Sequence, residues 1–170
     1  RRVVAAVARF GGVVTLVAVR AAAWVGPSDA GEDFAPVALY VVLWVVVLWA
    51  SAVFGDIWKG LNPWDTLAIG VTRTPGPTPP AAPPDASLRW SHWPAAAGLF
   101  AFVWLELAYV EPSDPRVIAI GLTAYTVIVL TCAAVFGRRW LATGEAFTVL
   151  FGRVALIAPI GQIRPATYLG

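Results

Sequence analysis

The chain has 170 residues, of which 59% are hydrophobic and only 13% are charged, and its net charge is +2. Soluble domains carry about 25% charged residues, so this composition excludes an ordinary soluble domain and indicates an integral membrane protein. The small net charge and the scattered basic residues also argue against a nucleic-acid partner.

Two reactive residue types occur only once, and this limits the chemistry that the chain can support. Cys132 is the only cysteine and His92 is the only histidine. No internal disulfide can form, and the three or four ligands of a usual zinc site are missing. We therefore predict neither a metal nor a cofactor. Because the sequence contains no methionine, we expect it to be a fragment of a longer protein.

The first apolar segment, residues 4–25, is interrupted by arginines. Arg2, Arg9 and Arg20 are separated by 7 and 11 residues, which places them on one stripe of a helix. Two interpretations follow: a spanning helix whose arginines face protein or reach the interface, or an amphipathic helix on the membrane surface. The orientation of the other spans favours the spanning helix. An acidic loop follows at residues 26–35.

Residues 37–54 form the strongest predicted span. Their 18 residues include no charge, glycine or proline. A helix of that length extends about 27 Å, close to the thickness of the hydrocarbon core of a bilayer. Residues 55–70 are then predicted to form a short interfacial helix, with Asn62 as N-cap and Pro63 at the first helical position.

The second half of the chain contains two further predicted spans. Six prolines between residues 75 and 84 first predict a proline-rich linker over residues 73–89. The span at 95–110 carries Glu106, whereas the span at 117–136 is uncharged. The predicted fold class is therefore all-α: a polytopic transmembrane helix bundle with four spans plus interfacial helices.

The last apolar segment, residues 146–160, is broken by Arg153 and Pro159. It is predicted to be either a partial fifth span or a re-entrant or interfacial helix. Glu145 and Arg153 are eight residues apart, which is a poor spacing for a direct pair along one helix. We instead expect Glu145 in the first turn of this helix, with Thr143 as its N-cap.

The distribution of basic residues predicts the orientation. They lie at the N-terminus, between residues 55 and 94 and after residue 136, whereas the loop at 26–35 has none and the turn at 111–116 has only Arg116. Because basic loops stay on the cytoplasmic side, we predict a plasma (inner) membrane protein with its N-terminus and proline-rich linker in the cytoplasm. Its expected partners are the lipid bilayer and further spans or subunits. Five tryptophans would anchor it at this interface: Trp58, Trp64, Trp90, Trp93 and Trp140.

A sequence echo links the two halves. Val53-Phe54-Gly55 followed by Trp58 recurs, at an offset of 82, as Val135-Phe136-Gly137 followed by Trp140. Seven of the 19 positions aligned from residue 52 to residue 70 are identical. Two interpretations remain open: a parallel repeat of two spans plus an interfacial helix, or the recurrence of Gly and Trp wherever a helix leaves the membrane.

Ionisable residues in or beside the apolar segments are the candidate site residues: Arg20, Glu106, Glu145 and Arg153. A carboxylate near the centre of a span costs about 2.5–3.5 kcal/mol. Arg20 and Glu106 lie roughly 6–8 Å below the outer ends of their spans, so we predict that they pair. Such a pair would lock two helices together or form a proton or substrate site. Alternatively, Glu106 reaches the interface alone.

A family resemblance rests on four groups of residues: Gly55-Asp56, Trp58-Lys59 and Leu61 to Trp64; Trp93 to Ala96 and Gly98 to Leu107; Asp114 to Arg116; and Phe136-Gly137, Trp140-Leu141, Gly144-Glu145 and Phe147. Over most of residues 30–160 the chain resembles a family of bacterial multi-pass membrane proteins labelled fenitrothion hydrolase-like. The resemblance implies a longer chain with more spans and membrane-bound hydrolysis of organophosphate esters. It implies no catalytic residues.

Three hypotheses for the function follow. The resemblance implies a membrane-bound hydrolase or a subunit of one. The intramembrane charges and the sequence echo favour a transport or membrane-complex component. The third hypothesis is a structural membrane subunit without a site of its own. The sequence shows none of the usual motifs of serine hydrolases, zinc proteases or P-loop enzymes.

Overall fold

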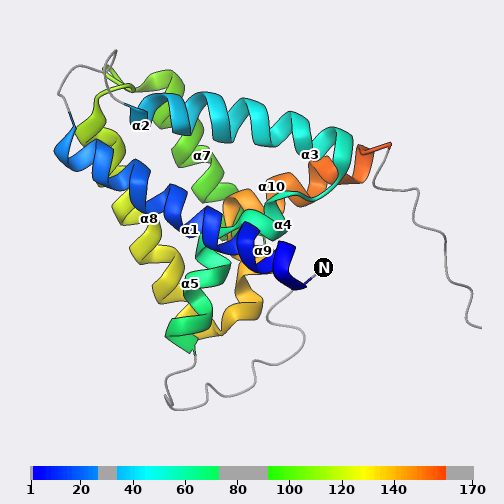
Figure 1. The fold of residues 1–170 in the computed structure, drawn as a ribbon. Helices are drawn as coiled ribbons and strands as arrows, with labels where there is room; N and C mark the ends of the chain where they lie inside the picture. The colour runs from blue at the N-terminus through cyan, green and yellow to red at the C-terminus, as the bar shows by residue number, and fades with distance from the viewer. Residues whose placement is uncertain (1, 27–33, 73–91, 160–170) are drawn as a thin grey trace, which may run out of the picture.

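The computed structural model describes residues 2–26, 34–72 and 92–159, and all regular structure in these ranges is helical. Figure 1 shows the helices in chain order. Their bounds are α1 Arg2–Val25, α2 Phe34–Pro36, η1 Val37–Val47, α3 Leu48–Phe54, α4 Trp58–Leu61, α5 Pro63–Thr72, α7 Trp93–Ala108, α8 Pro115–Phe136, η2 Arg138–Trp140, α9 Leu141–Gly144, α10 Ala146–Val154 and η3 Ala155–Ile157. The predicted linker at 73–89 lies outside the described residues.

Three helices of the described ranges are long and apolar enough to cross a membrane: Ala6–Val25, Phe34–Phe54 and Pro115–Phe136. They match three of the predicted spans. The fourth predicted span is the 16-residue helix α7, which is about 24 Å long and therefore shorter than the others. A fourth crossing in the structure would instead be the pair Arg138–Gly144 and Ala146–Ile157, which is bent by 60°. This bend agrees with the broken or re-entrant alternative for the last segment.

Two glycines end the long helices that precede the bends. Gly55 follows α3 with φ 98° and Gly137 follows α8 with φ 81°. Residues with a Cβ rarely adopt positive φ, so glycine allows the chain to reverse at both places. After each reversal, a short helical segment leads to a second helix, which is α5 in the first half and α10 in the second.

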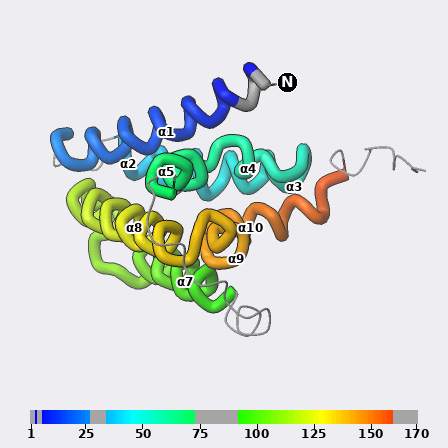
Figure 2. The backbone as a smooth tube through the Cα atoms, turned by 90° about the horizontal axis from the view of Figure 1, so that it is seen from below, coloured from blue at the N-terminus to red at the C-terminus, as the bar shows by residue number. Residues whose placement is uncertain are grey.

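Each short helix packs against helices of both halves of the chain. α5 contacts α1 and α8, whereas α10 contacts α7 and α3. Figure 1 shows α5 running beside the C-terminal end of α8, and α10 running toward the C-terminal end of α3. Figure 2 shows α5 between α1 and α8. The two halves are therefore held together by two contacts: α5 of the first half packs against α8, and α10 of the second half packs against α3.

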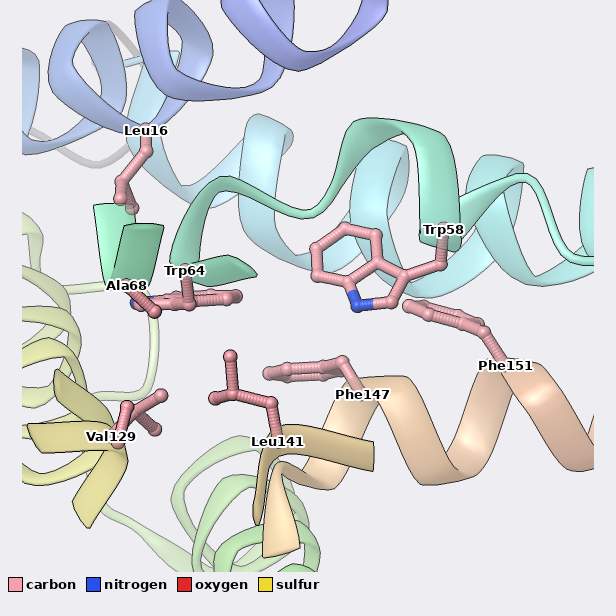
Figure 3. Packing of buried hydrophobic residues seen from close by; sticks show 9 residues of the cluster. Leu16, Trp58, Trp64, Ala68, Val129, Leu141, Phe147 and Phe151 are labelled. Carbon is pink, nitrogen blue, oxygen red and sulfur yellow. The ribbon is translucent and has the colours of Figure 1, made fainter. Parts of the chain in front are cut away.

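The aromatic core lies where these short helices begin. Trp58, Trp64, Phe147 and Phe151 are buried together, and the rings of Trp64 and Phe147 stack with centroids 6.2 Å apart. Leu16 of α1 and Val129 of α8 close this core from the sides (Figure 3). Both residues lie near the middle of their long helices. The core therefore sits about half-way along the spans.

This position differs from the interfacial helix predicted for residues 55–70. Pro63, Trp64 and Ala68 are buried, so α5 begins inside the bundle rather than along its surface. The physical reason is that its apolar face finds α1 and α8 on either side. The capping residue Asn62, moreover, finds polar partners in the interior.

We predict that a side chain at Gly12 is not tolerated, because a Cβ there would lie 1.8 Å from the backbone carbonyl oxygen of Leu61. Gly12→Ala should lower the free energy of unfolding by about 1–3 kcal/mol. The measurement is denaturation by sodium dodecyl sulfate in mixed micelles, followed by circular dichroism. Gly11→Ala is the matched control, since a Cβ at Gly11 meets nothing within 4 Å. Equal unfolding midpoints for the two variants would contradict this packing.

Candidate functional site: a buried carboxylate between two helix N-termini

Asn62 caps the first short helix, as the sequence predicted. Its Oδ1 accepts hydrogen bonds from the backbone N–H groups of Trp64, at 2.9 Å, and Asp65, at 3.1 Å. Pro63 occupies the first helical position, where its missing N–H costs nothing. The side chain of Asn62 is itself buried, so its amide nitrogen also needs partners inside the protein.

Glu145 caps the second short helix. Its carboxylate accepts from the backbone N–H groups of Phe147, at 2.9 Å, and Thr148, at 2.7 Å. The predicted cap Thr143 was wrong, because its hydroxyl donates to the carbonyl of Trp140. The chain is extended at Glu145, with φ −85° and ψ 124°, between the helices α9 and α10. This break puts Glu145, and not Thr143, immediately before the first helical residue.

The two caps meet in the interior. The amide nitrogen of Asn62 donates to Glu145 Oε2 at 3.3 Å and to the hydroxyl of Thr148 at 2.8 Å. That hydroxyl in turn donates to Oε2, and the hydroxyl of Tyr125 donates to Oε1. We name these four side chains the capping cluster: Asn62, Tyr125, Glu145 and Thr148. They come from both halves of the chain.

The geometry fits an ionised Glu145. The side chain is fully buried, and all five of its contacts are donors: two backbone N–H groups, two hydroxyls and one amide. The carboxylate also lies at the N-terminus of α10 and close to that of α5, where the helix dipoles favour negative charge. A buried carboxylate is costly unless it is satisfied in this way. The cluster therefore stabilises one charge inside an apolar bundle.

The cluster lies at mid-depth of the apolar helices. Tyr125 is at the centre of α8, which runs from Pro115 to Phe136. The indole N–H of Trp64 donates to the hydroxyl of the next residue, Thr126, at 3.1 Å. If α8 crosses a bilayer, the carboxylate of Glu145 consequently lies near the bilayer centre.

The sequence echo corresponds to a structural one. Both copies contain a glycine of positive φ, a short helical segment, a polar cap and a second helix. The caps themselves were not aligned, because Asn62 and Glu145 are separated by 83 residues and the echo has an offset of 82. Their meeting could have been suspected only by comparing the N-cap positions of the two halves rather than their identical residues.

An ion pair also joins the halves. Arg138 donates from Nε and Nη2 to the two carboxylate oxygens of Asp65, at 2.7 and 2.6 Å. It links the segment after α8 to the first turn of α5. The side chains remain partly exposed, so the pair contributes little to stability on its own, about 0–1 kcal/mol. It orients α5 against α8.

The predicted pair between Arg20 and Glu106 was wrong. Arg20 donates to the hydroxyl of Thr123 at 3.2 Å, and no carboxylate of the described residues lies within 4 Å of its guanidinium. The reason is the order of the helices: α1 packs against α8, whereas α7 packs against α9 and α10. Glu106 is half-buried on α7.

The other predicted residues are placed as follows. Arg153 is exposed and lies 3.2 Å from His92 Nε2, not beside Glu145. Trp93 is exposed and Trp140 is half-buried, while Trp90 lies outside the described residues. Trp58 and Trp64 are only 5% and 2% exposed. These two tryptophans fill the core, because α4 and α5, which carry them, begin beside the middle of the long helices.

A pocket of about 320 Å³ lies beside the cluster, and we name it the polar pocket after the three polar residues among its seven lining residues. Its lining includes His92 and Arg153 at the surface and Thr148 of the cluster. The described residues contain no group of three or more histidines, cysteines or carboxylates that could hold a metal ion. No protein-family model, curated protein or solved structure matches the chain.

We predict that the capping cluster is energetically coupled. Glu145→Gln should destabilise the protein by about 3 kcal/mol, because the new amide hydrogens face donors that the carboxylate had satisfied. Tyr125→Phe should cost about 1–2 kcal/mol, and the double variant should cost less than the sum. The measurement is again detergent-induced unfolding. Glu111→Gln, in an exposed turn, is the control and should stay within about 0.5 kcal/mol of the parent. Strict additivity would contradict a shared network.

Proposed function

We propose that the chain is a multi-pass plasma (inner) membrane protein, with its N-terminus in the cytoplasm, that acts as a proton-linked transport component. The observation that carries this proposal is the meeting of two broken helices, N-terminus to N-terminus, at an ionisable residue at mid-depth. Discontinuous helices in corresponding positions of two halves are typical of binding sites in transporters. Carboxylates inside a membrane are characteristic of proton relays and substrate paths.

The polar pocket supports this proposal. It connects the surface near His92 and Arg153 with Thr148, and the hydroxyl of Thr148 contacts Glu145. The hydroxyl of Tyr125 contacts the other carboxylate oxygen from the opposite side. A proton that arrives through the pocket would therefore meet the hydroxyl of Thr148, which can give its own proton to Glu145 Oε2 and take the new one. Glu145 is then the group that would hold the proton.

The hydrolase activity implied by the family resemblance stays a prediction. The described residues add no arrangement that favours it over transport. The same preparation of protein can test both activities.

We predict that the purified full chain, reconstituted in liposomes with an internal pH-sensitive dye, conducts protons when a pH gradient is imposed. Ala142→Phe should reduce this flux to the level of protein-free liposomes. Ala142 is exposed and lines the polar pocket, so the ring would fill the access path without touching Glu145. Ala134→Phe, on an exposed face of α8 outside the pocket, is the matched control and should leave the flux unchanged.

Two results would overturn the proposal. One is a parent protein whose flux equals that of protein-free liposomes. The other is equal flux in the Ala142→Phe and Ala134→Phe variants. Release of the phenol product from a thiophosphate ester by the same liposomes, without proton flux, would favour the hydrolase instead.

A further inference from the structure

A second, apolar cavity of about 610 Å³ lies along α7 and α8, and residues of other helices, among them Leu39, Leu43, Trp64 and Phe147, complete its lining. One face of each helix lines it, with residues from Pro94 to Leu105 on α7 and from Ile118 to Cys132 on α8. At about 1.5 Å per residue, the cavity follows the helices for roughly 17–21 Å. It is therefore long and narrow, and it runs in the direction of the spans.

Small residues create this space. Ala97, Gly98 and Ala101 line it on α7, and Gly121 and Ala124 line it on α8. In membrane proteins, small residues usually allow two helices to pack closely. Gly98 and Gly121 do so here, since a Cβ at Gly98 would lie 3.5 Å from the Tyr125 ring and one at Gly121 would lie 3.6 Å from Leu105 Cδ2. Ala97, Ala101 and Ala124 instead line the open space beside these contacts. The volume that larger side chains would fill is left for another apolar group.

The cavity opens sideways from the bundle. Ala101 and Ala124 are exposed, and so are Trp104 and Ile128, at 50% and 59%. In a bilayer, these residues would face lipid. An apolar occupant can thus enter from the surrounding lipid without crossing water.

The two ends of the cavity differ in charge. Trp140 and Cys132 line one end, and Arg139 immediately precedes Trp140. Arg139 is exposed, and no carboxylate of the described residues lies within 4 Å of it. The opposite end lies beside the turn that carries Glu111, Asp114 and Arg116, so the acidic charges there exceed the basic one. An anionic headgroup is therefore attracted to the first end and repelled from the second.

We propose that this cavity is a binding site for an anionic phospholipid, with one acyl chain between α7 and α8 and the headgroup at Arg139. The apolar lining and the length of the cavity suit an acyl chain, and the basic charge of Arg139 suits an anionic headgroup. The cavity shares no lining residue with the polar pocket, and of the capping cluster only Tyr125 lines it. Lipid binding there does not require proton transport, so this proposal does not depend on the proposed transport function.

The test is native mass spectrometry of the purified full chain in detergent, titrated with dipalmitoyl phosphatidylglycerol. Ala101→Leu and Ala124→Leu fill the cavity from its two walls, and both should reduce the fraction of lipid-bound protein. Ala134→Leu makes the same change on an exposed face of α8 outside the cavity and should bind like the parent. Arg139→Gln should weaken binding about fivefold, the usual effect of one basic residue near an anionic headgroup.

Cys132 supplies an independent readout in the unmutated chain. It lines the cavity and is the only cysteine, so bound lipid should slow its alkylation by N-ethylmaleimide. Dibutyryl phosphatidylglycerol and inorganic phosphate should give no protection, because they lack a chain that fills the cavity. The proposal is overturned if the three leucine variants bind equally, if phosphatidylcholine binds as well as phosphatidylglycerol, or if dipalmitoyl phosphatidylglycerol leaves the alkylation rate unchanged.

Discussion

The carboxylate of Glu145 is the constraint on which the rest of the bundle depends. Its burial among apolar helices is acceptable only because five donors surround it. Three of these donors belong to α10 itself, but Tyr125 comes from α8, and Asn62 comes from the first half of the chain. The charge can be satisfied only if these elements are already together. The cluster thus couples local capping to the tertiary fold.

The same requirement explains why each short helix contacts a long helix of the other half. Each begins at the cluster, and each then runs outward along a spanning helix of the other half. The bidentate pair between Arg138 and Asp65 repeats this connection closer to the surface. The halves are therefore joined by interior polar contacts, by aromatic packing of Trp58 and Trp64, and by exchanged helices. Apolar contact alone would give little specificity in lipid, where the surroundings are equally apolar.

The bundle combines a filled aromatic core with two unfilled spaces. The first half places large aromatic side chains near the capping cluster, and the core there is filled. Along α7 and α8, small side chains leave an open cavity beside the filled core. A polar pocket approaches the cluster from the side of α10. The bundle thus contains the polar pocket and the apolar cavity, and no residue lines both of them.

Local sequence patterns predicted the helical elements well. Hydropathy located the helices that begin near Ala6, Phe34 and Pro115 to within a few residues, and Asn62 was recognised as a cap from its neighbours Pro63 and Asp65. These predictions succeed because helix formation and capping depend on residues close in sequence. The burial of Trp58 and Trp64 in the core was not predicted. An apolar indole suits both an interface and a core, and only the neighbouring helices distinguish the two.

By itself, the sequence determined that the chain forms apolar helices and that Asn62 starts the first short helix. Only the tertiary structure decided that Asn62 and Glu145 meet and that Arg20 contacts Thr123 rather than Glu106. These contacts join residues that are about 80 to 100 positions apart. Such pairings follow from how the helices pack against one another, and no spacing within a single helix encodes them.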